Sequence, residues 1–210
     1  IGLASAAISL LRWQKNAGKF DFDYRPKIDN PRFMSARQAV ALIPDNACLM
    51  GMGMTVSARP AILWSAIRER YRLTGAPKNL TVITAGGAGG RGKVPGTAEE
   101  LGLEGLTTTF ISGHHETVRS ILDLAHNDKC VLGILPQGVI AHLAEAQGKG
   151  ESTVDTKVGV GTFMDPRYGT GSQVVPDRGE QLVSVHGNML RYRIPRVTAA
   201  VAVAAAADEE

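Results

Sequence analysis

The chain has 210 residues, of which 44% are hydrophobic and 20% are charged, and its formal net charge at pH 7 is +3. This length allows one large domain with a full hydrophobic core, and the composition is that of an ordinary globular protein. The 23 Lys and Arg residues are dispersed and aromatic residues make up only 5%, so the clustered cations and stacking platforms of a nucleic-acid surface are missing. We therefore expect no nucleic-acid partner.

The sequence also carries no signal for a membrane or for export. No apolar run approaches the length of about 20 residues that a membrane helix needs, and residues 1–13 lack the charged leader of a secretory signal. The two cysteines, Cys48 and Cys130, each fall in an apolar run and are expected to be buried free thiols. Together these features predict a cytoplasmic protein.

The N-terminal part, residues 1–32, is predicted to differ from the rest. A helix of moderate amphipathicity is expected at residues 2–17, and an arm with Pro26 and Pro31 follows at residues 18–32. We interpret residues 1–32 as a helix and an extended arm that packs on the domain or on a second subunit. Residues 33–210 form the main predicted domain.

From Ser35 onwards, helices and short apolar strands alternate. Ser35 is expected to cap a helix, and Pro60 is expected in the first turn of another. Predicted helices cover residues 36–43, 60–71, 115–125 and a segment after Gly138; predicted strands cover residues 47–52, 80–84, 106–111 and 130–135. Because these strands are apolar rather than alternating, and strands and helices follow each other in repeat, the predicted fold class is α/β, with a mainly parallel open sheet and helices on both faces.

The pattern changes near the C-terminus. Residues 180–185 and 189–194 flank the turn sequence His186-Gly187-Asn188, which predicts a β-hairpin. Residues 197–206 are expected to form a further buried strand, rich enough in alanine for close packing.

Four residues follow the ends of predicted strands: Met52, Gly86, Ser112 and Gln137. Because the carboxyl ends of parallel strands meet at one edge of a sheet, we expect these loops to converge there. Gln137, between Pro136 and Gly138, is the most informative, since an amide donates to a carboxylate or a developing oxyanion without carrying charge. The alternative is that its side chain caps the following helix.

Two further patterns lie in these loops. Residues 87–92 match GxGxxG after a strand, but Lys93-Val94-Pro95-Gly96 delays the helix that a dinucleotide site requires. These glycines instead either present backbone N–H groups to an anion or serve only as a turn. His114 and His115 have no third ligand at a recognisable spacing, so we expect no metal and place His114 in a loop that lines the same cleft.

Three segments carry a resemblance to a known family. They are the Pro-Gln-Gly motif with its helix, KVGVGTFMDPR at residues 157–167 with its trailing glycines, and DNACLMGMGMTVSARP at residues 45–60. The chain resembles the α domain of the class I CoA-transferases from about residue 35 onwards. This resemblance implies the fold shared by CoA-transferases and ribose-5-phosphate isomerase. It also implies acyl-CoA and a small carboxylic acid as partners, and coenzyme A as a substrate rather than a permanently bound cofactor.

The resemblance also bears on the site. We expect substrate contacts from Gln137, Gly138, Gly51, Gly53, Met54, Gly86, Gly87 and His114. The family's nucleophile is a glutamate in a Ser-Glu-Asn-Gly type motif of its β half, and we find no such motif here. No catalytic residue is therefore expected in this chain, and the β half is expected as a separate chain or a continuation, in a homo- or hetero-oligomer.

Two alternatives stay open at the level of sequence. Met52, Met54 and Ala58 depart from the family's first signature, which is compatible with a CoA-thioester hydrolase or a ring-opening enzyme of the same fold. A non-catalytic ligand-sensing domain with a similar sheet is the other alternative, because fold alone does not determine function.

Overall fold

The structure is a computed structural model, and it describes residues 8, 11, 19–53, 58–91 and 94–204. The described helices are α2 (Ala36–Ala41), α3 (Ala61–Thr74), α4 (Arg119–His126) and α5 (Gln137–Gly148), with a 3₁₀ helix η1 (Ala98–Leu101). The described strands are β1 (Cys48–Gly51), β2 (Leu80–Thr84), β3 (Thr107–Ser112), β4 (Val131–Ile134), β5 (Thr153–Thr156), β6 (Val183–His186), β7 (Met189–Arg193) and β8 (Ala199–Val201).

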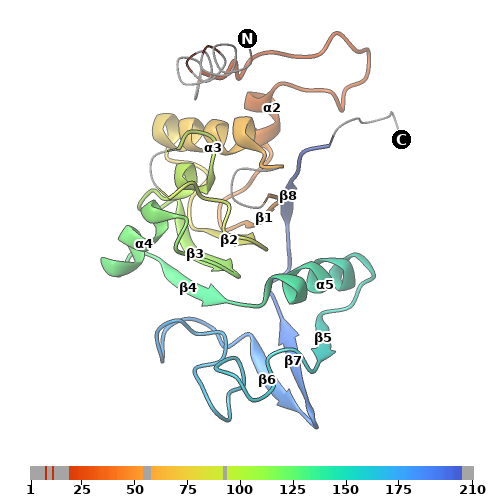
Figure 1. Cartoon of the computed structure of the whole chain (residues 1–210). Helices are drawn as coiled ribbons and strands as arrows, with labels where there is room; N and C mark the ends of the chain where they lie inside the picture. The colour runs from red at the N-terminus through yellow and green to blue at the C-terminus, as the bar shows by residue number, and fades with distance from the viewer. Residues whose placement is uncertain (1–7, 9–10, 12–18, 54–57, 92–93, 205–210) are drawn as a thin grey trace.

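A five-stranded parallel sheet is the centre of the molecule (Figure 1). Its strand order is β4-β3-β2-β1-β8, and each neighbouring pair runs parallel. Helices α2, α3 and α4 cover one face, whereas α5 lies against the other. The predicted fold class is therefore confirmed, and consecutive residues of a strand contribute to different cores because their side chains alternate between faces.

Two hydrophobic clusters follow from this arrangement. The first contains the fully buried Trp64 of α3 and Phe110 of β3. The second contains Leu143 of α5 and Tyr192 of β7, so α5 is packed between the main sheet and the C-terminal strands. Cys48 and Cys130 are buried and free, as predicted, and burial raises the pKa of these thiols to about 11 and about 12.

The C-terminal strands form two different structures. The predicted hairpin is confirmed as β6 and β7, and β5 joins it to make an antiparallel sheet of order β5-β7-β6. The final predicted strand is shorter than expected and runs along the edge of the main sheet as β8, where Ala199 pairs with Leu49 of β1. β5 was not predicted, because its sequence Thr-Val-Asp-Thr is too polar to indicate a buried strand.

The predicted helix at residues 2–17 lies outside the described residues, apart from Ile8 and Leu11, which are helical and exposed. The arm after it packs on the domain. The Arg37 backbone N–H donates to the Phe22 carbonyl at 3.0 Å, and the Arg37 guanidinium forms an ion pair with Asp23 at 2.6 Å. Phe22 also contacts the first hydrophobic cluster. The packing half of the prediction is thus observed, and a contact with a second subunit stays a prediction.

One helix begins later than expected. The predicted helix at residues 115–125 starts at Arg119, because residues 115–118 form a turn. The Glu99 carboxylate accepts hydrogen bonds from the backbone N–H groups of Arg119 and Ser120 at 2.9 and 2.8 Å, which satisfies two of the free donors at this helix end. Within the described part of the chain, no helix is long and apolar enough to cross a membrane.

Candidate active site

The carboxyl ends of four strands form one straight edge. Gly51, Thr84, Ser112 and Ile134 are neighbours in register across β1, β2, β3 and β4. The loops that contain Met52, Gly86 and Gln137 therefore leave the sheet from the same edge, and the predicted convergence is confirmed. This is also the edge at which open parallel sheets bind ligands.

Gln137 is the first residue of α5, and its side chain is exposed. The residue at the N-cap is Pro136, which makes no side-chain capping bond, and no described residue forms a hydrogen bond with the Gln137 amide. The helix-capping alternative is therefore wrong. The amide lies at the sheet edge with its donors and acceptor free among the described residues.

Gly113 explains how Gln137 is held there. A Cβ atom on Gly113 would lie 2.4 Å from Cγ of Gln137 and 2.9 Å from the carbonyl oxygen of Ala85. The Gly113 N–H also donates to that carbonyl at 3.2 Å. The β3 loop thus passes directly beneath the Gln137 side chain, and only glycine leaves room for this contact.

The glycine loop after β2 meets the β3 loop at His114. Gly86 and Gly87 are buried, and a Cβ atom on Gly87 would lie 2.3 Å from both the His114 carbonyl oxygen and Oγ1 of Thr117. Thr117 Oγ1 is buried and has no hydrogen-bond partner among the described residues. Gly86, Gly87 and His114 are therefore brought together, as their assignment to one cleft requires.

The two adjacent histidines have different environments. His115 is largely buried, with Nε2 2.9 Å from the Gly133 carbonyl oxygen and its ring edge-on to Phe110. Burial lowers the pKa of His115, so the neutral ring acts as a packing residue. The His114 side chain is 42% exposed, 3.7 Å from the Glu116 carboxylate. In the described ranges, no group of His, Cys, Asp and Glu is arranged to hold a metal ion.

The predicted residues at the end of β1 lie at the same edge of the sheet, and β2 and β3 separate them from β4, which leads to Gln137. A Cβ atom on Gly51 would lie 2.9 Å from Cζ2 of Trp64, so α3 packs directly on this glycine. Gly53 has a φ of 120°, a conformation that favours glycine. Met54 lies outside the described residues. Gly138 is exposed in the first turn of α5, and a Cβ atom there would have nothing within 4 Å.

The segment KVGVGTFMDPR forms a compact loop around Asp165. The Asp165 side chain is fully buried and accepts hydrogen bonds from the Gly161 N–H at 3.0 Å and from Arg167 Nη2 at 2.6 Å. The hydrogen bond from Arg167 holds the pKa of Asp165 well below its usual range. Farther along, the Ser172 carbonyl accepts from the Ile134 N–H at 2.8 Å, which joins this region to the outer edge of β4.

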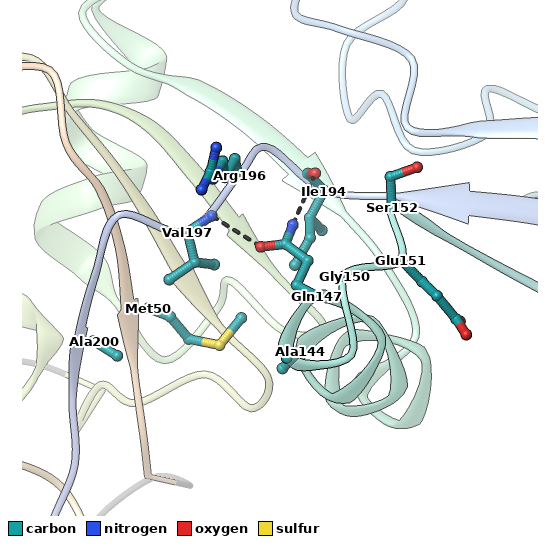
Figure 2. A pocket seen from close by; sticks show the side chains of 11 residues that line it. Met50, Ala144, Gln147, Gly150, Glu151, Ser152, Ile194, Arg196, Val197 and Ala200 are labelled. Atoms are coloured by element: carbon teal, nitrogen blue, oxygen red, sulfur yellow. Dashed lines mark hydrogen bonds between the residues drawn. The ribbon is translucent and has the colours of Figure 1, made fainter.

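A cavity of about 760 Å³ lies at the opposite end of α5 from Gln137 (Figure 2). Gln147 closes one side of it: its Nε2 donates to the Pro195 carbonyl at 3.0 Å, and its Oε1 accepts from the Val197 N–H at 3.0 Å. None of the described predicted site residues lines this cavity.

Two residues that shape this edge, Gly113 and Thr117, were not predicted as site residues. Gly113 directly follows a predicted strand, as Gly86 does, and that position was the available signal. Thr117 carried no signal, because its hydroxyl meets Gly87 only through the tertiary fold.

The parallel α/β sheet, with glycine loops and an exposed glutamine at its carboxyl edge, is the fold of CoA-transferases, as comparison with known proteins shows. The chain is 34% identical over 181 residues to caffeate CoA-transferase from Acetobacterium woodii, which is 85% of this chain and 34% of that protein. It is 32% identical over 140 residues to acetate CoA-transferase YdiF from Escherichia coli O157:H7, which is 66% of this chain and 26% of that protein.

Solved structures give the same result. The crystal structure of the YdiF apoenzyme from Escherichia coli O157:H7 matches with a TM-score of 0.71 at 30% identity, over 81% of this chain and 34% of that chain. Glutaconate CoA-transferase from Acidaminococcus fermentans shares the fold, with a TM-score of 0.53 at 17% identity over 80% of this chain and 54% of that chain.

Sequence and fold together place this chain in the CoA-transferase family, in agreement with the resemblance of its motifs. No model of a protein family matches the sequence. The chain spans about a third or less of the length of the curated relatives it matches. The fold is consistent with the N-terminal half of the family.

Proposed function

We propose that this chain is the α half of an acyl-CoA:carboxylate CoA-transferase and binds substrate through Gln137 and the glycine loops. The observation that carries the proposal is the free amide of Gln137, held over Gly113 at the edge where the Gly86–Gly87 loop emerges. The names of the relatives, and a YdiF structure that is a thioester complex with CoA, support acyl-CoA and a carboxylic acid as the substrates.

In the proposed reaction, a glutamate of the β half attacks the thioester carbonyl and expels the CoA thiolate, which leaves an acyl-glutamyl anhydride. The thiolate then attacks the glutamyl carbonyl and releases the donor acid as its carboxylate, which leaves a glutamyl-CoA thioester. The acceptor carboxylate reverses these two steps and departs as the new acyl-CoA. Covalent catalysis of this kind divides one difficult exchange into easier steps.

The role of this chain is to bind and orient. The Gln137 amide would donate to the oxyanion that develops when the thioester carbonyl is attacked, and a neutral donor placed in advance lowers that barrier. Gly86 and Gly87 would bring the backbone close to the substrate, with His114 beside them. We assign the remaining substrate contacts to Gly51, Gly53, Met54 and Gly138. Coenzyme A takes part as a substrate, with no permanently bound cofactor.

The β half is proposed as a separate chain or a continuation, and the working enzyme as a homo- or hetero-oligomer. The match to about a third of each curated relative supports this division. We also propose a cytoplasmic location, in keeping with the free thiols of Cys48 and Cys130.

The test is CoA transfer from acetyl-CoA to a panel of carboxylic acids by the native protein that contains this chain. We expect Gln137→Ala to lower kcat/KM by about 10²-fold, the effect of removing one oxyanion donor. Gln173→Ala is the matched control, because the Gln173 amide only donates to the Gly179 carbonyl in a surface loop, and its activity should be unchanged. Equal rates for Gln137→Ala and the parent would refute the assignment of Gln137.

The same assay tests the hydrolase alternative. Met52 is 49% exposed at the carboxyl edge, where the family's signature has glycine, so the shape of the acyl site differs there. A hydrolase would release free CoA from acetyl-CoA at the same rate with and without an acceptor acid. A transferase requires the acceptor.

A further inference from the structure

Arg59 follows the carboxyl end of β1, and among the described residues one of its guanidinium nitrogens has no hydrogen-bond acceptor. Arg59 lies between β1 and α3, and the nitrogen without an acceptor, Nη1, is shielded from solvent. No carboxylate of a described residue forms an ion pair with it. Burial alone lowers the pKa of Arg59, because no anion compensates the lost hydration.

Several other arginines of the described chain have partners for their guanidinium groups. Ion pairs with carboxylates hold Arg37, Arg68, Arg167, Arg178, Arg191 and Arg193. Arg70 donates to two backbone carbonyls. Arg68 also has a shielded nitrogen without an acceptor, Nε, but its guanidinium has the Glu100 carboxylate as a counter-charge. Arg59 has no such carboxylate among the described residues, and because a shielded guanidinium nitrogen without an acceptor is costly, it calls for an acceptor from outside the described chain.

The N-terminus of α3 also has a positive potential that no acidic side chain of its first turn compensates. Its N-cap is Pro60, which provides no capping side chain, and the first turn contains no acidic residue. The Ala61 and Leu63 N–H groups donate to the Arg59 and Pro60 carbonyls at 2.8 and 3.0 Å. Among the described residues, the Ile62 N–H is therefore the donor of the first turn without an acceptor. Together with the helix dipole, this N–H gives the end of α3 a positive potential.

Trp64 supplies an independent sign of a missing ligand. Its side chain is fully buried, and in the part of the chain that the structure describes Nε1 has no acceptor. Helical side chains lean toward the N-terminus of their helix, and the Trp64 ring lies against Gly51 at the end of β1. The unpaired indole N–H is therefore at the same corner of the sheet as Arg59.

We propose that Arg59, the N-terminus of α3 and the Trp64 indole N–H form a subsite for an anionic oxygen of a substrate. The chemistry is that of a carboxylate or phosphate group, which accepts from a guanidinium and from neutral N–H donors. This inference rests on the proposed function, which brings both kinds of group to this edge.

The bound anion is not the reacting group. β1 and β4 are three strand spacings apart, which is about 14 Å, so a group at Arg59 lies well beyond hydrogen-bonding distance of Gln137. Two sources remain: a second carboxylate at the far end of the acid substrate, or a phosphate of coenzyme A. The subsite would thus select substrates by length and charge.

The experiment measures binding in the native protein without turnover. Two probes are titrated separately, coenzyme A and the dicarboxylate glutarate, with isothermal titration calorimetry as the readout. We expect Arg59→Gln to weaken one of the probes by about tenfold to a hundredfold, the effect of a lost charged hydrogen bond. Arg59→Lys should recover part of the affinity, and Trp64→Phe should weaken the same probe by about fivefold.

Arg72→Gln is the matched control. Arg72 is exposed at the other end of α3, so this variant removes one positive charge from the same helix and should bind as the parent does. Thermal unfolding of each variant shows that the fold is kept. A loss for coenzyme A alone identifies a phosphate, and a loss for glutarate alone identifies a second carboxylate.

The proposal is overturned if the parent binds neither probe, or if Arg59→Gln binds both as the parent does. These outcomes are separate from those of the transfer assay. Binding that depends on Arg59 in a protein without transferase activity would refute the proposed function and leave the subsite standing.

Discussion

The carboxyl edge of the main sheet and the C-terminal region around β5, β6 and β7 differ in whether polar side chains have hydrogen-bond partners. At the edge, Gln137, Thr117 and Trp64 each have a polar side-chain atom without a partner among the described residues. In the C-terminal region, Asp165 is bonded to Arg167 and Asp155 is bonded to Arg191.

This difference distinguishes a binding surface from a structural one. A buried donor without an acceptor costs about 1–3 kcal/mol, so several at one edge are retained only where something else is gained. In the C-terminal region the polar groups serve the fold. For example, Gln181 Oε1 accepts from both the N–H and the hydroxyl of Ser172, at 2.8 and 2.7 Å.

The largest effect is expected in the C-terminal region. Asp165→Asn removes a buried carboxylate that accepts from Gly161 and Arg167, and it leaves the Arg167 guanidinium without its counter-charge. We expect the thermal midpoint to fall by roughly 5–10 °C. Removing one partner of a buried ion pair is strongly destabilising, because it leaves the other charge uncompensated. Differential scanning calorimetry measures this change.

The control for this prediction is Asp23→Asn. Asp23 and Arg37 form a bidentate pair of similar geometry on the surface, at 2.6 and 3.0 Å, with side chains 68% and 50% exposed. The midpoint should change by less than about 2 °C. Equal shifts for the two variants would show that burial of Asp165 contributes nothing.

At the sheet edge we expect function to respond more than stability. Gly113→Ala introduces a methyl group 2.4 Å from Cγ of Gln137 and 2.9 Å from the Ala85 carbonyl oxygen, so the Gln137 side chain moves aside and the loop backbone shifts slightly. Displacing the amide should lower kcat/KM for CoA transfer by about tenfold or more, because catalytic groups tolerate little misplacement. The control is Gly148→Ala at the other end of α5, where the added Cβ meets nothing within 4 Å.

Gly138→Ala should be neutral in stability or more stable by about 0.5 kcal/mol, because alanine is the better helix former. Its transfer rate also tests whether substrate contacts Gly138. If Gly113→Ala lowers stability severely and leaves the rate of the folded enzyme unchanged, Gly113 acts in folding and not in holding Gln137.

The smallest effect is expected in acid. The hydrogen bond from Arg191 lowers the pKa of Asp155 to about 2, and the Arg191 charge and His186 act in the same direction. Because the unfolded carboxyl titrates near about 3.9, the unfolded chain binds more protons below that pH, and stability falls as the pH drops from about 4 to about 2. Asp155→Asn should flatten this part of the profile, measured by urea unfolding at a series of pH values.

Local features were readable from the sequence because they depend on near neighbours in the chain. Ser35 was predicted to cap a helix, and its hydroxyl accepts from the Gln38 N–H while the Gln38 side chain accepts from the Ser35 N–H. The β6–β7 hairpin depended in the same way on a turn sequence with Gly187 at positive φ. The parallel sheet followed from the apolar strands, and the convergence of the loops followed from the parallel sheet.

Contacts between distant residues were decided by the tertiary structure alone. β5 is a strand because β7 supplies the hydrogen bonds that its own polar sequence does not predict. The hydroxyl of Thr198 accepts from the Cys48 N–H across 150 residues and helps to fix β8 at the sheet edge.

For the candidate site too, some features were determined by the sequence and others only by the tertiary structure. The sequence by itself determined that Gln137 and the glycine loops leave one edge of a CoA-transferase-like sheet. The reason is that the succession of strands and motifs along the chain is a property of the sequence. Only the tertiary structure decided that Gly113 lies under Gln137 and that Arg59 and Trp64 lack acceptors. The physical reason is that a missing partner is a property of the surroundings, which no residue type or spacing records.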